Sequence, residues 1–206
     1  LYENSAIMVL DKPAGLLSVP GKGVELHDSL LTRIRWQYPE AETAHRLDMA
    51  TSGLIVVALT KEAERQLKAQ FQQRSPQKRY IALVEGELPT EKGVIDLPLI
   101  CDWPNRPKQM VSFSEGREAI THYHRLELLT YQEAPLTRVA LSPITGRSHQ
   151  LRVHLQAIGH PILGDRFYGS AWGRRVASRL YLHADYLSFI DPMSQKRLAF
   201  RSPTPF

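Results

Sequence analysis

The chain of 206 residues is predicted to fold as an α+β protein around a mixed, largely antiparallel sheet. Strand-like runs outnumber helical stretches, and the two do not alternate in strict β–α order. The run Leu54–Leu59 is apolar throughout and contains two valines and an isoleucine, which is typical of a strand buried on both faces. Residues 93–128 hold shorter segments with more polar alternation, which favours antiparallel strands.

Nine segments have the residue patterns of regular structure. In the segment 61–74, Ala63 and Leu67 lie four residues apart, which favours an amphipathic helix. Ser148 is placed to cap a later helix, and Gly159 is expected to stop it. The predicted strands are 6–10, 54–59, 79–84, 136–141, 180–190 and 197–201, the predicted helices are 27–38, 61–74 and 148–158, and polar loops are expected at 102–108 and 160–173.

The composition is that of a globular protein with a basic excess. Hydrophobic residues make up 43% and charged residues 23% of the chain, which excludes a mainly disordered protein. Lysine and arginine outnumber aspartate and glutamate by 26 to 21, so the net charge is +5 and the pI is near 9.4. This excess fits a polyanionic partner, although many proteins without such a partner carry as much.

The sequence also bears on where the protein works. The single cysteine, Cys101, has no partner for an internal disulfide, which fits a reducing compartment. No stretch approaches eighteen apolar residues, and nothing resembles a secretion signal. We therefore expect a cytoplasmic monomer without a membrane partner, folded as a single domain over residues 1–206.

Several chemistries lack the residues that they need. The sequence contains neither a pair of cysteines nor a His-Glu-x-x-His motif, so no metal site is expected. The Gly-x-Ser-x-Gly elbow of many serine hydrolases is missing. The glycine-rich loops that bind nucleotides or dinucleotides are missing too. The sequence therefore predicts an activity without metal or cofactor.

A single carboxylate stands out just before the central strand. Asp48 follows His45-Arg-Leu and precedes the small polar run Thr51-Ser-Gly53. A loop that feeds a rigid strand is a common place for a functional residue. Asp48 could equally bond its own backbone in a turn, as aspartate often does. The local sequence leaves both interpretations open.

Two other segments carry residues that suit a site. Tyr80 follows Lys78-Arg at the start of a predicted strand. A tyrosine in a strand more often packs in the core or against a neighbouring strand than it serves a functional site. In the segment 146–154, Arg147 and Arg152 are expected to project from the first turns of a helix, where backbone amides favour anions. The simpler interpretation there is a solvated basic helix end. Taken alone, neither segment decides between a functional and a structural interpretation.

Taken together, these segments resemble the motifs of the RluA-type pseudouridine synthases. The motifs are His-Arg-Leu-Asp-x-x-Thr-Ser-Gly-Leu at 45–54, Lys-x-Tyr-x-Ala-x-Val-x-Gly at 78–86 and Gly-Arg-Ser-His-Gln-Leu-Arg-Val-His at 146–154. Further family elements are matched in the same order at 11–15, 160–165 and 182–184. The related RsuA type has an arginine where His149 stands, so His45 and His149 favour the RluA type.

The resemblance implies a fold and a set of site residues. The implied fold is the pseudouridine-synthase fold, with a mixed sheet flanked by helices and a central active-site cleft. Asp48 matches the catalytic carboxylate, Tyr80 the ring that stacks on the target base, and Arg147 the arginine that faces the carboxylate. The residues expected to bind the substrate are His45, Arg46, Thr51, Lys12, Arg79, His149, Gln150, Arg152 and Arg166.

The implied reaction is the isomerisation of uridine to pseudouridine in structured RNA, namely ribosomal RNA, a tRNA stem-loop or both. The reaction breaks the C1′–N1 bond and joins C5 to C1′ without gain or loss of atoms, so it needs no metal or redox cofactor. The target nucleotide must be flipped out of its stack, and Arg46 could fill the vacated space. Rival hypotheses are an RNA-binding or chaperone protein without catalysis, and a glycosylase or nuclease that also flips bases.

Overall fold

The computed structural model describes all residues, 1–206, and divides into two compact units. Unit 1 comprises residues 1–78 and 183–205, and unit 2 comprises residues 79–182 together with Phe206. The predicted single domain over 1–206 stays a prediction. None of the helices is both long and apolar enough to cross a membrane.

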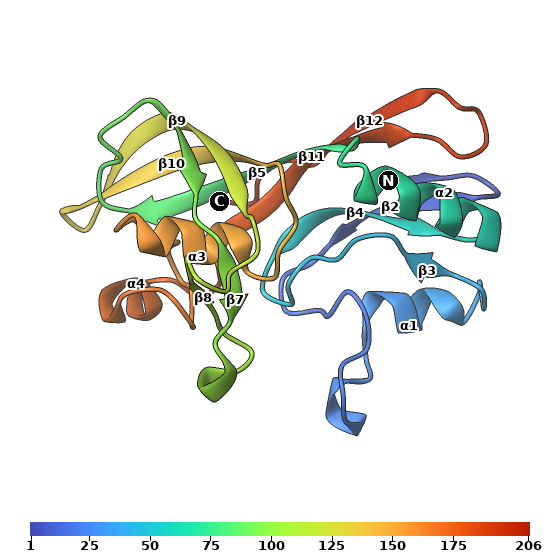
Figure 1. Cartoon of the computed structure of the whole chain (residues 1–206), viewed down its shortest axis with the longest axis horizontal. Coiled ribbons are helices and arrows are strands. Elements are labelled where there is room, and N and C mark those ends of the chain that lie inside the picture. Colours follow the sequence, from blue (N-terminus) through green and yellow to red (C-terminus); the bar gives the residue numbers. More distant parts are fainter. The chain divides into compact units, whose positions relative to one another are not determined.

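Unit 1 is built around strand β4, which is buried along its whole length (Figure 1). Antiparallel β2 pairs with one edge of β4. The other edge pairs first with parallel β11, through Ser52 and Gly53, and then with antiparallel β3 at its far end. The strands of this sheet are β1 (Tyr2–Glu3), β2 (Ile7–Lys12), β3 (Glu42–Thr43), β4 (Ser52–Ala58), β11 (Leu182–Ile190) and β12 (Arg197–Arg201).

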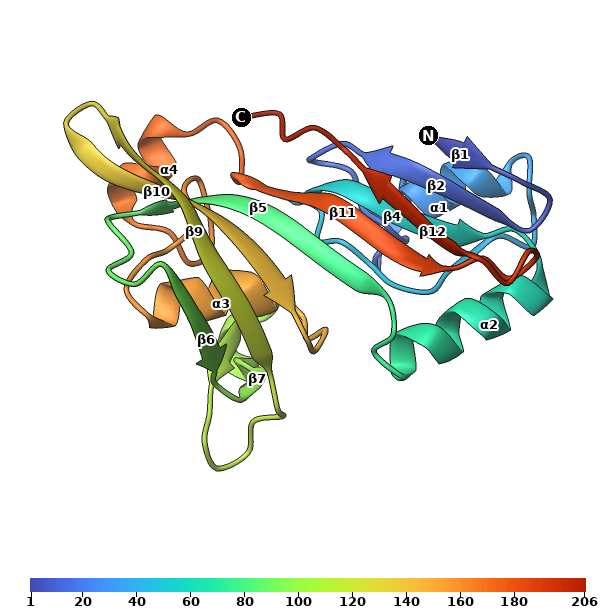
Figure 2. The same ribbon diagram turned by 90° about the horizontal axis from the view of Figure 1, so that it is seen from above.

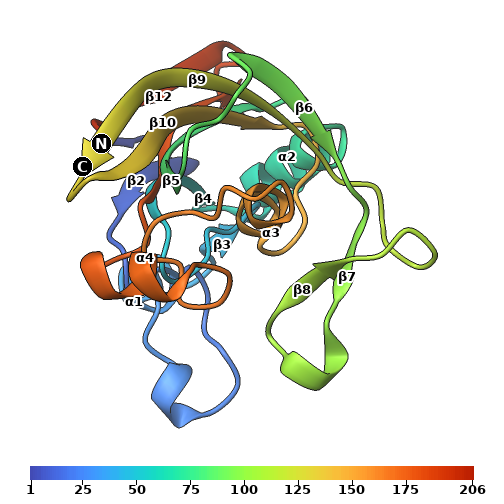
Figure 3. The same cartoon turned by 90° about the vertical axis from the view of Figure 1, so that its left-hand side faces the viewer.

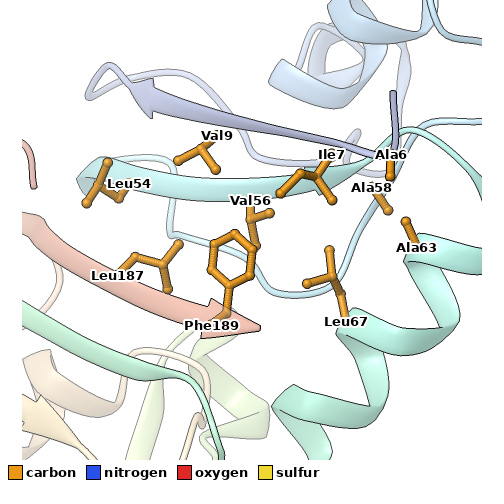
Figure 4. Packing of buried hydrophobic residues seen from close by; sticks show 10 residues of the cluster. All are labelled: Ala6, Ile7, Val9, Leu54, Val56, Ala58, Ala63, Leu67, Leu187 and Phe189. Carbon is orange, nitrogen blue, oxygen red and sulfur yellow. The ribbon is translucent and has the colours of Figure 1, made fainter. Parts of the chain in front are cut away.

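Helices cover both faces of β4. Ala63 and Leu67 of α2 (Lys61–Gln72) pack on Val56 of β4 and on Phe189 of β11, as Figure 4 shows. Side chains alternate along a strand, so Ile55 and Val57 point to the opposite face. In Figure 1 that face is covered by α1 (Leu30–Arg35), whose apolar residues are buried. The expected double-sided burial of the central strand is confirmed.

Gly53 is required where β4 meets β11. Its φ of 117° lies in a region that side-chain-bearing residues rarely adopt. A Cβ atom at this position would lie 2.3 Å from the carbonyl oxygen of Ala184 on β11. The glycine of the Thr-Ser-Gly run therefore lets two strands approach each other directly after the loop that carries Asp48.

Unit 2 contains an antiparallel sheet in the order β5-β10-β9-β6, curved around helix α3 (Figures 2 and 3). A separate hairpin of β7 and β8 also contacts α3. The strands are β5 (Gln77–Glu85, in unit 2 from Arg79), β6 (Lys92–Asp96), β7 (Leu99–Cys101), β8 (Gln109–Val111), β9 (Ile120–Tyr131) and β10 (Ala134–Pro143), and the helices are α3 (Gln150–Ala157) and α4 (Ala171–Val176). Short 3₁₀ turns occur at Val24–Leu26 in unit 1 and Trp103–Asn105 in unit 2.

Two helix starts differ from those expected, and one further helix is not predicted by the sequence. The helix expected from His27 begins after Ser29, whose hydroxyl accepts the Thr32 N–H. The N-cap of α3 is His149, in a left-handed conformation with φ of 54°, and not Ser148. Helix α4 is not predicted, because a loop is expected at 160–173 and no element after it. The hydroxyl of Ser170 caps this helix by accepting the Gly173 N–H. The predicted α+β class with a mixed, largely antiparallel sheet is confirmed.

Candidate active site

The loop that carries Asp48 is fixed by hydrogen bonds on both sides of the carboxylate. The N–H of Thr51 donates to the Asp48 carbonyl at 3.0 Å and closes a turn. The hydroxyl of Ser18 donates to the Leu47 carbonyl at 2.7 Å and accepts the Leu47 N–H at 3.0 Å. Leu47 is buried and Asp48 is half-buried. These bonds fix the backbone of the loop on both sides of the half-buried Asp48.

Lys12 fixes the other end of this loop from inside the unit. Its side chain is fully buried, with 0% exposure. The ammonium donates to the carbonyls of Pro13 at 2.9 Å, Leu16 at 2.7 Å and Met49 at 3.3 Å. A buried ammonium needs such acceptors, because loss of its hydration is costly. The predicted contact of Lys12 with RNA phosphate does not fit this burial, and Lys12 instead joins the turn after β2 to the residue that follows Asp48.

His45 also has an internal role that differs from the expected RNA contact. The Val56 N–H donates to its Nε2 at 3.1 Å, so this nitrogen carries no proton. Its ring stacks on Phe71 of α2, with centroids 4.5 Å apart. Burial, with a smaller contribution from the positive charge of Lys78, lowers the pKa of His45 to about 3. His45 is therefore a neutral residue that joins the start of the Asp48 loop to β4 and α2.

The end of the loop is connected to a chain of hydrogen bonds, in which the two bonds of His183 are buried. The Ser202 hydroxyl donates to the Asp11 carboxylate, so it accepts from Nε2 of His183 at 3.0 Å. Nδ1 of His183 then accepts from the Ser52 hydroxyl at 2.8 Å. Thr51 beside it is 2% exposed. The expectation that Thr51 binds the substrate does not fit this burial, whereas the exposed Arg46 remains open to a ligand.

In unit 2, Tyr80 and Arg147 belong to one antiparallel framework. Tyr80 on β5 pairs with Leu141 on β10, and β10 ends two residues later at the loop that carries Arg147. The Nε–H of Arg147 donates to the Glu118 carbonyl at 2.9 Å. This bond fixes the plane of the guanidinium and leaves its two terminal nitrogens as donors for a ligand. Arg79 and Tyr80 are both half-buried.

Gln150 was expected to contact RNA, but it is 4% exposed and fully engaged inside unit 2. Its Oε1 accepts the Arg147 N–H at 3.0 Å and the Thr145 hydroxyl at 2.7 Å. Its Nε2 donates to the Ile120 carbonyl and to the Thr121 hydroxyl, both at 3.0 Å. Gln150 therefore fastens the Arg147 loop to the start of β9.

Arg152 likewise has an internal partner in place of a phosphate. Its side chain is 5% exposed, and its Nε and Nη2 donate to the two carboxylate oxygens of Asp165 at 2.7 and 2.8 Å. The guanidinium also lies 5.2 Å from the ring centres of Phe167 and Tyr168. These contacts argue against the expected RNA contact of Arg152. The neighbouring Arg166 is exposed and keeps that expectation.

His149 takes up its strained conformation in a cluster of rings. Its Nδ1 lies 2.7 Å from the hydroxyl of Tyr168, which also accepts the Gln109 N–H at 2.8 Å. Its ring lies 5.7 Å from that of Phe167. A non-glycine residue at φ 54° costs free energy that the surrounding contacts must offset. Its backbone therefore turns the chain from the Arg147 loop into α3.

Sequence reasoning missed the residues that position these groups. Ser18, Thr121 and Thr145 are buried polar residues that bond the loops, and none of them stands out by spacing. Thr121 lies in an alternating strand, where a threonine is ordinary. The one usable signal is Ser142–Gly146, which marks a turn next to the arginine motif but does not show its partners.

The chain is similar to known proteins in sequence and in fold. The family model described as RNA pseudouridylate synthase matches residues 6–157. The chain belongs to this family. Its relatives include the dual-specificity RNA pseudouridine synthase RluA of Escherichia coli K12, which is 56% identical over 206 residues, all of this chain and 93% of the relative. The RluA of Yersinia pestis is 55% identical, with 100% and 98% covered. The synthase is thus of the RluA type, as its motifs predict.

Solved structures of other pseudouridylate synthases have the same fold. Human RNA pseudouridylate synthase domain containing 1 is 31% identical, with a TM-score of 0.82 over 100% of this chain and 82% of the human chain. Human RNA pseudouridylate synthase domain containing 4 is 26% identical, with a TM-score of 0.76 and coverages of 100% and 88%. The predicted pseudouridine-synthase fold is confirmed. This synthase is an isomerase that acts on uridine in RNA.

Proposed function

We propose that this synthase modifies uridines in stem-loops of both ribosomal RNA and tRNA, as a cytoplasmic monomer built from one catalytic domain. The support for two classes of substrate is that the RluA relatives, at 50–56% identity over the whole chain, are named dual-specificity enzymes. The net charge of +5 suits a polyanion. A compact stem-loop is recognised by its shape and its unstacked bases, which does not require a separate sequence-reading module.

Asp48 is the proposed essential carboxylate. The reaction needs a group that acts at the sugar or the base when the C1′–N1 bond breaks, either as a nucleophile or by promoting proton loss. The observation that carries this assignment is the fixed Asp48 loop, which Ser18, Lys12 and His45 anchor from inside unit 1. Three internal anchors around one half-buried carboxylate are typical of a group whose position matters for chemistry.

Tyr80 and Arg147 are the other proposed catalytic residues. A tyrosine ring can stack on uracil, and its hydroxyl can assist removal of the C5 proton after the new bond forms. The guanidinium of Arg147, held at Nε by the Glu118 carbonyl, provides two parallel donors for the negative charge that develops on the uracil when the C1′–N1 bond breaks. No proton has to leave the guanidinium for this role.

The target nucleotide reaches these residues by base flipping, which costs a few kcal/mol when a base leaves its stack. Arg46 is exposed and lies two residues before Asp48, so its side chain can occupy the space that the nucleotide vacates. Arg79 and Arg166 are the proposed phosphate contacts among the residues expected to bind RNA, and His149 remains a further candidate. Lys12, His45, Thr51, Gln150 and Arg152 support the site from within.

Substitution of Asp48 by asparagine tests the proposal, because the side chain keeps its size and loses its charge. We expect no pseudouridine in a stem-loop substrate and an RNA affinity within a few-fold of the wild type. The control is Asp28→Asn, since Asp28 is an exposed aspartate of the same unit that pairs with Arg33. That variant should keep full activity.

Four outcomes would contradict the proposal in different ways. Turnover of Asp48→Asn above about one thousandth of the wild-type rate would remove Asp48 as the essential carboxylate. RNA bound without any change in mass or base connectivity by the wild-type protein would favour the binding-only rival. Release of uracil, or a cut in the RNA, would indicate a glycosylase or nuclease. Modification of only one of the two RNA classes would reject dual specificity.

A further inference from the structure

We propose that Thr121 and Gln150 are positioning residues of the synthase, which set the place of Arg147 through a directed chain of buried hydrogen bonds. This inference rests on the proposed catalytic role of Arg147. Thr121, Gln150 and His154 are 0%, 4% and 0% exposed, so none of them can touch a substrate. Each nevertheless carries polar groups deep in unit 2, and every one of these groups has a partner.

The donor and the acceptor of each bond in the chain can be assigned by starting from the Leu97 carbonyl. The Leu97 carbonyl can only accept, so Nε2 of His154, at 2.9 Å, carries the proton. Burial lowers the pKa of His154, which favours the neutral ring in which Nδ1 is then an acceptor. The Thr121 hydroxyl, 2.9 Å from Nδ1, must donate to it.

The same reasoning fixes the amide of Gln150. Because the Thr121 proton is used for His154, the Thr121 oxygen accepts from the Gln150 Nε2 at 3.0 Å. Nε2 also donates to the Ile120 carbonyl, so the amide has its oxygen on the other side. That oxygen accepts the Arg147 N–H at 3.0 Å. If the amide were flipped, its NH₂ group would face the Arg147 N–H and its oxygen would face the Ile120 carbonyl. Only the observed orientation therefore satisfies these hydrogen bonds.

The chain acts on the position of Arg147 and not only on the stability of the fold. Arg147 is joined to the start of β9 at two points, through its N–H by way of Gln150 and through its Nε by the Glu118 carbonyl. The Thr145 hydroxyl adds a third link, since it donates to the Gln150 oxygen and accepts the Ile120 N–H. Loss of the Gln150 contact therefore frees the backbone of the loop that carries the guanidinium.

The test is Thr121→Val, which keeps the shape of the side chain and removes the hydroxyl. The His154 Nδ1 and the Gln150 Nε2 then lose their shared partner, and the nitrogen side of the Gln150 amide keeps only its bond to the Ile120 carbonyl. We expect the single-turnover rate to fall about tenfold or more, because small misplacements of a catalytic group have effects of this size. RNA affinity should stay within about threefold, since phosphate contacts dominate binding. Thr121→Ser should restore most of the rate.

The control is Thr137→Val in the same unit. Thr137 is also a 0% exposed strand threonine, and its hydroxyl donates to the Gly86 carbonyl and accepts the Leu88 N–H. It has no link to Arg147 among these bonds, so its loss should lower thermal stability as much as Thr121→Val while leaving the rate near the wild-type value. Equal rate losses in the two valine variants would overturn the inference, because general destabilisation would explain both.

A third variant, Arg147→Ala, separates this inference from the proposed function on which it rests. If Arg147→Ala is inactive and Thr121→Val reacts normally, Arg147 is catalytic but Thr121 does not position it, and the inference fails alone. If Arg147→Ala reacts normally, the assigned role of Arg147 fails and the inference fails with it. The expected result is an inactive Arg147→Ala and a slow Thr121→Val with nearly normal RNA binding.

Discussion

Arg152 and Asp165 form a buried, bidentate ion pair that joins α3 to the loop before α4. The two nitrogen–oxygen distances are 2.7 and 2.8 Å, and the side chains are 5% and 1% exposed. Asp165 also accepts the N–H groups of Phe167 and Tyr168, so one carboxylate shapes the turn and neutralises the arginine. The pair therefore fixes the loop that presents Arg166 and the ring of Phe167 at the surface.

Arg152→Ala should unfold the protein more easily without acting directly on RNA binding. Removing one partner of a buried ion pair leaves the other charge uncompensated and costs about 3–5 kcal/mol. Arg166→Ala, fourteen residues along the chain at an exposed position, should instead keep the stability and reduce the salt dependence of RNA affinity by about one phosphate contact. Denaturant unfolding and a salt titration of RNA binding check both variants. An Arg152→Ala protein that unfolds at the wild-type denaturant concentration would contradict the internal role of Arg152.

Gly53→Ala should be far more harmful than an alanine at another glycine with positive φ. At Gly53 the new Cβ atom would lie 2.3 Å from a backbone oxygen of β11, in addition to the conformational strain. We expect a loss of about 3 kcal/mol or more in the free energy of unfolding. Gly159 has a φ of 85° and open space around it, so Gly159→Ala should lose only about 1–2 kcal/mol of stability, from conformational strain. Similar losses at both glycines in denaturant unfolding would refute the close-approach argument.

The elements with strong periodicity were predictable from the sequence. Leu54–Leu59 gave the buried strand β4, and the four-residue spacing of Ala63 and Leu67 gave α2, because burial against neighbours is what those patterns record. Helix α4 was missed since it is only six residues long and contains Gly173, which lowers helix propensity. The short strands β1 and β3, of two residues each, exist only through pairing with β2 and β4.

The family motifs propose the residues of the candidate site, but they do not distinguish the individual roles of these residues. A motif records that a residue is needed and does not say whether its side chain meets the substrate or the protein. Lys12, Gln150 and Arg152 carry polar groups that suit RNA, yet each of these residues is buried and bonded internally. Only the tertiary structure reveals partners that are distant in sequence, namely Met49 for Lys12, Thr121 for Gln150 and Asp165 for Arg152.

Acid should destabilise the protein through His45 well before its carboxylates are protonated. The unfolded chain binds a proton at this histidine near pH 6.5, whereas the folded protein resists protonation down to about pH 3. Unfolding therefore takes up a proton between these values, and stability falls as the pH drops from 6.5, by at most about 1.4 kcal/mol per pH unit. Unfolding measured from pH 7 to 4.5 should show a shallower slope in His45→Gln than in the wild type. Parallel slopes would contradict a neutral His45 ring in the folded protein.

Arg147→Lys should not behave as a conservative substitution. The guanidinium donates from Nε to the Glu118 carbonyl and still offers two coplanar terminal nitrogens, while an ammonium cannot do both from one point. We expect the single-turnover rate to fall at least about tenfold, with a smaller change in RNA affinity. Arg174→Lys, at an exposed arginine of α4, should leave the rate unchanged.

The alternative role for Arg147 is a phosphate clamp, and the same variant distinguishes it. A phosphate contact depends mainly on positive charge, so lysine would keep most of the rate, and alanine would reduce the salt dependence of RNA affinity by about one contact. A reacting nucleotide that needs two parallel donors would lose rate with lysine, and the salt slope would stay nearly constant. Single-turnover rates and salt slopes of Arg147→Lys and Arg147→Ala therefore assign the guanidinium to chemistry or to binding.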